Sequence, residues 1–330
     1  MKKDYITEFF YSLAYNKKNE AEELFFKYTE VQNYPLALHF ACYFGRVEFV
    51  DIISSHKPIN GLDKCGANAL HYAVNESSLG ENNKDSIYKK FGSGICIPIY
   101  DFDLKNKFKS NESICDIIDI LIKKEINTEQ LIATDSEFPI TPIYYPICSN
   151  NRPVVEHMLK RGVKVNHVTD DYSILNCLIE HYSPKKYVSE GEDDCLDFAK
   201  YLIKNGAVFD SEHERSLDII IGSIKRQDLK LLDYFLKKVD LSSSEYLDTL
   251  SGDDDSYFME YYRTADDEWD EVFLNELIKT YTKNGADENI VQKLLDIIKY
   301  NYLAHEEDKI IIWDKNGLNI ELIKNKHTIL

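Results

Sequence analysis

The chain has 330 residues, 44% of them hydrophobic and 29% charged, and its 57 acidic against 39 basic side chains give a formal net charge of −18. A chain of this length and composition can bury a large core, whereas its negative charge argues against direct nucleic-acid binding through phosphate contacts. No apolar run approaches the roughly 20 residues that a membrane-spanning helix needs, and Met1 to Tyr5 lack the apolar region of a secretory signal, so we expect no membrane partner.

Residues 1–33 are predicted to form an N-terminal helical cap. Phe9, Phe10, Leu13 and Phe25 recur among many charged residues, which is typical of two amphipathic helices. Such helices shield the first apolar surface of a stacked array from water, because their outer faces are polar.

A short motif occurs twice in the next part of the chain. Leu36–Ala41 reads Leu-Ala-Leu-His-Phe-Ala, and Asn68–Ala73 reads Asn-Ala-Leu-His-Tyr-Ala 32 residues further on. In each copy a leucine and an alanine lie three residues apart, so they share one helix face, and the small alanine lets a second helix approach closely. Gly45 can end the first helix with a positive φ, and an apolar run from Val47 leads to the exit at Asn60.

This order of turn, short helix, glycine, second helix and hairpin resembles the ankyrin repeat, whose period of roughly 33 residues and Thr-Pro-Leu-His-x-Ala core are specific features. The resemblance implies an all-α solenoid of helix-turn-helix units joined by projecting β-turns. We interpret His39 and His71 as structural rather than catalytic or metal-binding, because a ring at that position can hydrogen-bond the backbone of the adjoining turn.

Weaker copies follow the two clear ones. Thr141–Tyr144 replaces the Thr-Pro-Leu-His run, and further copies begin at Ser173 and Ser216. Two stretches within the array are longer than ordinary loops and are interpreted as insertions. The predicted domains are the cap 1–33, about five ankyrin repeats over 34–240 with insertions near 75–112 and 183–194, an acidic aromatic-rich degenerate repeat over 241–289, and a C-terminal helical cap with a β-hairpin over 290–330.

Negative charge is concentrated in the degenerate repeat. From Asp253 to Glu271 nine acidic residues stand against the single Arg263, a net charge of −8 in 19 residues. One interpretation is a solvated loop, because charge runs often only keep a protein soluble. The other is a docking site for a basic protein, in which acidic groups speed encounter and aromatic anchors supply affinity. The candidate binding residues are Asp253, Asp254, Asp255, Tyr257, Tyr261, Tyr262, Asp266, Asp267, Glu268 and Trp269.

The resemblance also implies contacts from hairpin tips and from the exposed residues of each first helix. Matched position by position, the helix sites are Tyr43, Phe44, Asn75, Glu76, Glu180 and His181. The hairpin sites are Lys64, Glu137, Phe138 and Tyr172.

No catalytic motif stands out in the chain. It has no glycine-rich phosphate loop, no Gly-x-Ser-x-Gly elbow, no His-Glu-x-x-His and no Cys-x-x-Cys, and its seven cysteines form no close pair. The widely spaced cysteines are typical of reduced thiols in a cytosol. We therefore expect no enzyme, no cofactor and no metal. The alternative is an enzyme whose hidden site lies between the first insertion and the C-terminal region.

The sequence thus predicts a cytoplasmic, non-enzymatic module that binds another protein with a basic surface. The bias towards Lys, Asn, Ile, Tyr and Asp suits an AT-rich genome, and the degenerate, interrupted repeats resemble those of bacterial ankyrin proteins. Two roles stay open: an immunity protein that neutralises a toxin, or an effector that acts in the cytoplasm of a host cell after translocation. The sequence does not predict the oligomeric state.

Overall fold

The structure is a computed structural model of the chain. It describes residues 4–75, 109–132, 140–166, 174–181, 195–209, 216–242, 271–292, 294, 309–314 and 317–322. The chain divides into two compact units, one of Met1–Asp193 with Lys204–Ala207 and one of Asp194–Ile203 with Val208–Leu330.

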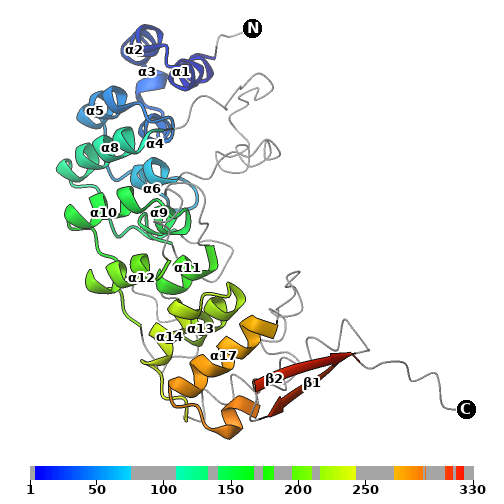
Figure 1. The fold of residues 1–330 in the computed structure, drawn as a ribbon. Helices are drawn as coiled ribbons and strands as arrows, with labels where there is room; N and C mark the ends of the chain where they lie inside the picture. The colour runs from blue at the N-terminus through cyan, green and yellow to red at the C-terminus, as the bar shows by residue number, and fades with distance from the viewer. Residues whose placement is uncertain are drawn as a thin grey trace, which may run out of the picture. The chain divides into compact units, whose positions relative to one another are not determined.

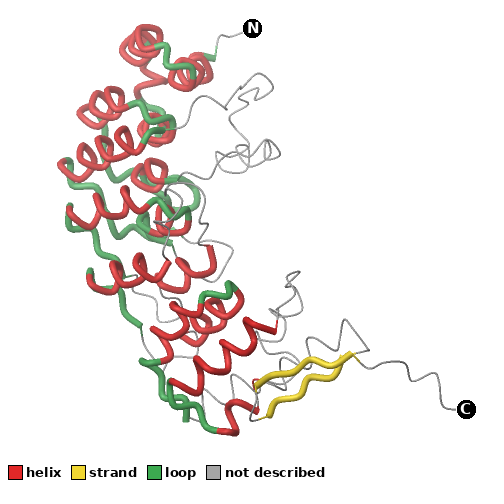
Figure 2. Tube along the Cα trace, in the orientation of Figure 1, coloured by secondary structure: helices red, strands yellow, loops and turns green. Residues whose placement is uncertain are grey.

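Short helices make up most of the described residues (Figure 2). The first unit holds α1 (Tyr5–Ala14), α2 (Lys18–Lys27), α3 (Thr29–Gln32), α4 (Ala37–Tyr43), α5 (Val47–His56), α6 (Ala69–Val74), α8 (Asn111–Lys123), α9 (Tyr144–Cys148), α10 (Arg152–Lys160) and α11 (Ile174–His181). The second unit holds nearly all of α12 (Cys195–Lys204), with α13 (Ser216–Lys225), α14 (Leu229–Leu236), α17 (Glu271–Lys283), β1 (Lys309–Asp314) and β2 (Gly317–Leu322).

The helices of the first unit lie in two rows (Figure 1). The first helix of each pair packs on the first helix of the next pair, in the order α4, α6, α9 and α11. The second helices form the other row, in which α5 packs on α8 and α8 packs on α10. Within the pairs, α4 contacts α5, α6 contacts α8 and α9 contacts α10, so the described part of this unit is a stack of helical hairpins.

Left-handed residues close the tight turns inside four helix pairs. Asn16, Gly45, Asn150 and Gln227 have φ between +51° and +67°, and each follows the first helix of its pair. In each turn the N–H of the next residue donates to a carbonyl five residues earlier, at 2.7–3.0 Å. These bonds satisfy carbonyls that a helix end otherwise leaves without partners, so the same turn recurs wherever two helices must fold back tightly.

A second set of left-handed residues ends the second helices. Glu125, Gly162, Gly206 and Gly285 have φ between +65° and +101°, after α8, α10, α12 and α17. Within the first unit the side-chain amide of Asn60 donates to the carbonyl of Glu125 at 3.2 Å. The amide of Asn166 likewise donates to the carbonyl of Gly206. The exit asparagine of one pair therefore bonds the left-handed residue that ends the next.

The pair of α6 and α8 has no tight turn, because residues 76–108 separate the two helices. Lys109 nevertheless lies against the end of α6, where its Nζ donates to the carbonyls of Tyr72 at 2.8 Å, Ala73 at 2.6 Å and Asn75 at 3.2 Å. A cation on the last carbonyls of a helix is stabilised by the helix dipole. The described residues on both sides of the first insertion are thus fixed to each other. Residues 76–108 and 182–194 lie outside the described residues, and they cover most of the predicted insertion 75–112 and all of 183–194. The end of the first predicted insertion is wrong, because α8 already begins at Asn111.

The motif histidines have the structural role that the sequence predicts. His39 and His71 are buried, and each Nε2 lies 3.3 Å from a backbone carbonyl of the following turn, that of Ala67 and that of Ile140. Nδ1 of His71 lies 3.2 Å from the backbone N–H of Asn68 and 2.9 Å from Oδ1 of its side chain, so both ring nitrogens have polar neighbours. Burial lowers the pKa of His71 to about 4 and lowers that of His39 as well, which keeps both rings neutral.

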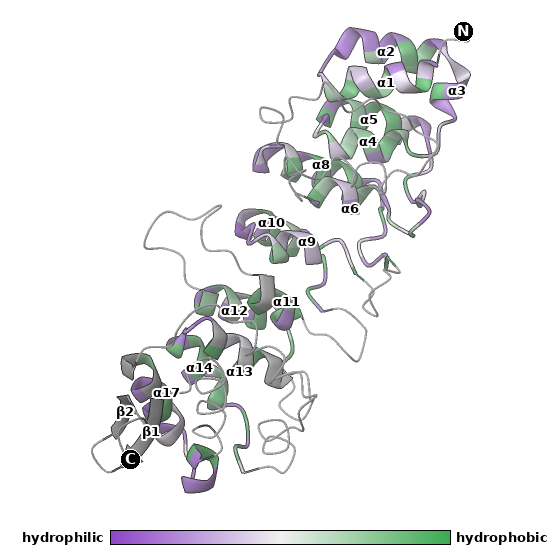
Figure 3. Ribbon diagram, turned by 90° about the vertical axis from the view of Figure 1, so that its right-hand side faces the viewer, coloured by the Kyte–Doolittle hydropathy of each residue, from purple (hydrophilic) through white to green (hydrophobic). Residues whose placement is uncertain are grey.

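The N-terminal helices bury one face and expose the other. Phe9, Phe10 and Phe25 are fully buried, and the ring of Phe10 lies 3.8 Å from that of Phe40 in the first repeat. The helix α2 is mainly hydrophilic, whereas α4 and α5 are mainly hydrophobic (Figure 3). This arrangement lets α1 and α2 cover the apolar end of the stack while leaving a polar surface to water.

In the second unit α14 packs on both α13 and α17. The carboxylate of Asp233 accepts hydrogen bonds from Lys237 at 2.6 Å, Lys283 at 3.1 Å and Asn284 at 2.9 Å, which ties α14 to α17. The strands β1 and β2 pair antiparallel, with Ile311 opposite Ile320, and β2 contacts α17.

A pair of glycine substitutions tests the turn geometry. A Cβ on Gly45 would meet Cγ of Lys109 at 2.7 Å, whereas a Cβ on Gly162 would meet nothing within 4 Å, and both residues have positive φ. We expect Gly162→Ala to lower the free energy of unfolding by about 1 kcal/mol and Gly45→Ala to lower it by about 2–3 kcal/mol, because only the second also displaces the lysine that caps α6. Urea unfolding followed by circular dichroism measures both, and equal losses would contradict the predicted contact.

Candidate functional site

The best-defined projecting turn is the finger formed by Asp63–Ala67. The N–H of Asp63 donates to the carbonyl of Ala67 at 2.9 Å, and Oδ1 of Asp63 accepts from the N–H groups of Cys65 and Ala67, both at 2.8 Å. The hydroxyl of Tyr72 donates to Oδ2 of the same carboxylate at 2.5 Å. One aspartate thus closes the turn and ties it to α6, so the tip is held rigidly.

A second finger begins at the equivalent place in the next repeat. Ile132 and Ile140 exchange two backbone hydrogen bonds, at 3.0 and 3.2 Å, and form an isolated antiparallel bridge. The histidine bonds show the equivalence, because His39 reaches Ala67 and His71 reaches Ile140. The residues between the bridge positions, 133–139, lie outside the described residues.

Two exposed leucines occupy matching positions on these fingers. Leu62 directly precedes Asp63 and is 47% exposed, and Leu131 directly precedes Ile132 and is 40% exposed. The fingers lie next to each other, since a Cβ on Gly66 would come within 3.3 Å of the carbonyl oxygen of Leu131. We call the exposed residues Leu62, Lys64, Cys65 and Leu131 the finger edge.

The predicted binding residues that the structure describes differ in how exposed their side chains are. Lys64 is exposed at the tip of its finger, as a contact residue must be. Tyr43 and Phe44 are half-buried at the end of α4, and Asn75 is buried, with its carbonyl bonded to Lys109.

The remaining predicted residues are only partly described. Glu180 and His181 lie in the last turn of α11, and their side chains are outside the described residues. The following predicted residues also lie outside the described residues: Glu76, Glu137, Phe138, Tyr172, Asp253, Asp254, Asp255, Tyr257, Tyr261, Tyr262, Asp266, Asp267, Glu268 and Trp269.

The first helices are more deeply buried than the resemblance implied. Every residue of α6 from Ala69 to Val74 is buried, and so is every residue of α4 from Ala37 to Cys42. Of these two helices only α4 therefore reaches water, at Tyr43. Among the described residues of the first two repeats, the finger edge is the better-exposed surface for a partner.

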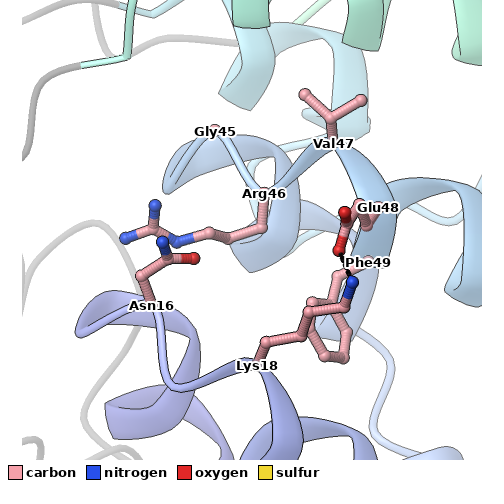
Figure 4. A pocket seen from close by; sticks show the side chains of 7 residues that line it. All are labelled: Asn16, Lys18, Gly45, Arg46, Val47, Glu48 and Phe49. Atoms are coloured by element: carbon pink, nitrogen blue, oxygen red, sulfur yellow. Dashed lines mark ion pairs between the residues drawn. The ribbon is translucent and has the colours of Figure 1, made fainter.

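A pocket of about 310 Å³ lies where the turn between α1 and α2 faces the turn between α4 and α5 (Figure 4). Its charged groups have partners within the protein: Lys18 forms an ion pair with Glu48, and Arg46 donates to the carbonyls of Leu13 at 2.6 Å and Ala14 at 2.8 Å. The guanidinium thus caps α1, so we interpret this pocket as a structural seam between the cap and the first repeat.

An ion cluster joins α8 and α10, which lie in the row of second helices. Asp119 of α8 accepts from His157 at 2.7 Å and from Arg161 at 2.7 and 2.6 Å. Burial pushes the pKa of Asp119 upwards, but the bonds from Arg161 and His157 outweigh it and hold the pKa below its usual value. The cluster ties α8 to the end of α10. Across the described ranges no three His, Cys, Asp or Glu side chains are placed to hold a metal ion, and no helix is long and apolar enough to cross a membrane.

Comparisons with known proteins give a likeness of structure alone. No family model matches the chain, and no curated protein matches it. Among solved structures the chain is similar to the human ASB11 ankyrin repeat domain, with 14% sequence identity and a TM-score of 0.44, over 76% of this chain and 84% of that domain. The helix pairs, the left-handed turns and the histidine bonds of this chain themselves define it as a helical-repeat protein with projecting fingers.

The sequence analysis did not single out Leu62 and Leu131. Neither leucine belongs to a motif, and an exposed leucine is common on protein surfaces. An alignment of the residues just before each finger could have found the two leucines. The sequence does not give that alignment, because Asp63 follows Asn60 more closely than Ile132 follows Asn127. Their equivalence becomes visible only from the backbone bonds.

The finger carboxylate gives a direct test of the turn. Asp63→Ala removes the acceptor of three hydrogen bonds, and we expect it to lower the free energy of unfolding by about 2–3 kcal/mol, because donors of the buried residues Ala67 and Tyr72 lose their partner. Lys64→Ala at the exposed tip is the matched control and should change it by less than about 0.5 kcal/mol. Thermal unfolding measures both variants, and similar losses would show that the carboxylate does not hold the finger.

The buried histidine gives a pH test. The unfolded chain protonates His71 near its usual pKa of about 6.5, whereas the folded chain does so only near 4. The stability that this difference confers is complete above about pH 6.5 and is lost as the pH falls towards 4, by about 3 kcal/mol. His71→Gln should therefore flatten the dependence of the urea midpoint on pH between 7 and 4. Parallel curves for the two proteins would refute the assignment.

Proposed function

We propose that this chain is a non-enzymatic ankyrin-type protein that acts by binding another protein. The observation that supports this most is the hydrogen-bonded finger Asp63–Ala67 beside the bridge of Ile132 and Ile140, where Leu62, Lys64 and Leu131 are exposed. Rigid presentation reduces the conformational entropy that is lost on binding, and an exposed apolar pair offers area that a partner can bury.

The proposed partner has a basic surface. The formal charge of −18 and the segment from Asp253 to Glu271, with a net charge of −8, would speed encounter with such a protein and repel nucleic acid. In this proposal the acidic segment steers the partner and the finger edge supplies contact area. The two surfaces act at different stages of binding.

The negative charge favours one biological role. A basic toxin such as a nuclease is neutralised when acidic groups cover its cleft, so we propose an immunity protein of a bacterial cytoplasm. The second role is an effector that engages a host protein. A neighbouring gene for a large protein with a basic C-terminal domain would favour immunity, whereas a host-translocation phenotype without such a neighbour would favour the effector.

Two charged substitutions at the finger edge test the proposed contact. We expect Leu62→Asp combined with Leu131→Asp to weaken binding of the partner, captured from the native cytoplasm and identified by mass spectrometry, by about tenfold or more, since contact residues of this kind contribute about 1 kcal/mol each. Phe26→Asp is the matched control, because Phe26 is 48% exposed but lies on α2 in the cap. Equal weakening by the control variant would exclude the finger edge as the contact surface.

A salt titration tests the steering separately. If the acidic segment guides encounter, the association rate should fall by about tenfold or more between 50 and 300 mM salt, because salt screens exposed charges beyond about 10 Å. The dissociation rate should change little over the same range. An association rate that is independent of salt would contradict the proposed basic surface.

A further inference from the structure

Two lysines of the second unit share one carboxylate on α14. Nζ of Lys237 lies 2.6 Å from Asp233, and Nζ of Lys283, at the end of α17, lies 3.1 Å from it. The hydrogen bond from Lys237 is the largest of the causes that hold the pKa of Asp233 below its usual range, so this carboxylate stays charged. An ammonium group has three N–H donors, which gives the two lysines more donors than one carboxylate can accept.

Two further lysines contact the ring of the next residue, Tyr234. Nζ of Lys238 lies 4.9 Å from the ring centroid, and Nζ of Lys200 on α12 lies 5.6 Å from it. Both separations are those of cation–π interactions, which extend to about 6 Å. Four exposed ammonium groups from three helices are therefore gathered around two consecutive residues, and we call Lys200, Lys237, Lys238 and Lys283 the lysine cluster.

The lysine cluster carries an excess of positive charge in an acidic chain. The carboxylates that pair with it are Asp233 and Asp197, which lies 3.9 Å from Lys200, so four positive and two negative groups leave a charge of +2. The nearby carboxylate of Asp240 accepts instead from the N–H and hydroxyl of Ser242, at 2.9 and 2.7 Å. Ammonium groups held close together repel one another, so an anion placed among them is stabilised.

Helix dipoles explain only part of this gathering. Lys237 directly follows α14 and Lys283 is the last residue of α17, and cations are favoured at such carboxyl ends. Lys200 lies within α12, which continues to Lys204, so its position beside Tyr234 has no such cause. The excess charge of the cluster is therefore left for another negative group.

The chain itself supplies negative charge close to the lysine cluster. The acidic segment from Asp253 to Glu271 has a net charge of −8 and belongs to the same compact unit. It begins 15 residues after Lys238 and ends at the first residue of α17. Fifteen residues span at most about 50 Å, so the segment can reach the cluster, and its attachment to both helices gives it an effective concentration in the millimolar range.

We propose that the lysine cluster is the docking surface for the acidic segment of the same chain. This contact goes beyond the proposed function, because it requires no partner. A nucleic acid fits the cluster less well, since ammonium groups already lie against the ring of Tyr234 and the net charge of −18 repels a long polyanion. A basic partner and the lysine cluster compete for the same carboxylates, so the partner gains the acidic segment by displacing the lysines.

Zero-length cross-linking tests the contact in the unmodified full chain. A carbodiimide joins an amine to a carboxylate only where the two touch, and a mixture of ordinary and nitrogen-15-labelled chains distinguishes links within one chain from links between copies. We expect links from the acidic segment to Lys200 or Lys283 within one chain, with a yield that falls at least threefold between 50 and 500 mM salt, because salt screens exposed charges. Mass spectrometry identifies the linked residues.

Three outcomes of the cross-linking would overturn the proposal. They are links from the segment only to lysines outside the cluster, links to the cluster only between copies, and no links from the segment at all. Each of these results leaves the proposed protein-binding function in place, because that function is tested by capture of a partner. Failure to capture a partner, with links to the cluster present, would contradict the proposed function and leave the docking contact standing.

Tryptic cleavage gives a second test, because Arg263 is the single basic residue between Asp253 and Glu271. Docking should slow cleavage after Arg263, since a protease acts on the undocked segment. We expect Lys200→Gln with Lys238→Gln to speed this cleavage about fivefold at 50 mM salt, as two exposed ion pairs are lost. These two lysines are chosen because the bonds of Asp233 that tie α14 to α17 stay intact.

Lys17→Gln with Lys27→Gln is the matched control. Lys27 has the same kinds of contact as the cluster, a carboxylate at 3.1 Å and the ring of Tyr28 at 5.5 Å, but it lies in the cap, and Lys17 pairs with Glu20 there. The control removes the same charge and should change the cleavage rate less than twofold. Equal rates for the two double variants, at unchanged thermal unfolding midpoints, would overturn the proposal.

Discussion

Mutual burial of short helices is the constraint on which this structure depends. α4, α6 and α9 have seven, six and five residues, whereas an isolated helix shorter than about 12–15 residues is marginal in water. These helices therefore exist because each is packed between neighbours, and α6 is buried along its whole length. Wherever the chain leaves a helix, other interactions must therefore hold the helix pairs together.

Left-handed turns and side-chain caps provide these interactions. Tight turns at Asn16, Gly45 and Asn150 return the chain within one pair, and Lys109 takes over this role where the first insertion separates α6 from α8. Arg46 caps α1 in a comparable way. Buried carbonyls at helix ends must find donors, and the left-handed turns, Lys109 and Arg46 provide them.

The same burial decides where a partner can bind. Among the first helices α4, α6 and α9, only Tyr43, Tyr144, Tyr145 and Cys148 are not fully buried. The finger edge exposes aliphatic area beside the finger Asp63–Ala67, whose backbone is held by hydrogen bonds to Asp63.

The sequence by itself determined the helix pairs, the turn at Gly45 and the structural role of His39 and His71, because these depend on local spacing and on a φ that glycine adopts easily. It also placed Lys64 at an exposed tip, since the motif fixes where the finger begins. Only the tertiary structure decided that Asn75 is buried, that Lys109 returns to α6, and that Leu62 and Leu131 match. These facts depend on contacts between residues far apart in the chain, and no local pattern records which of them meet.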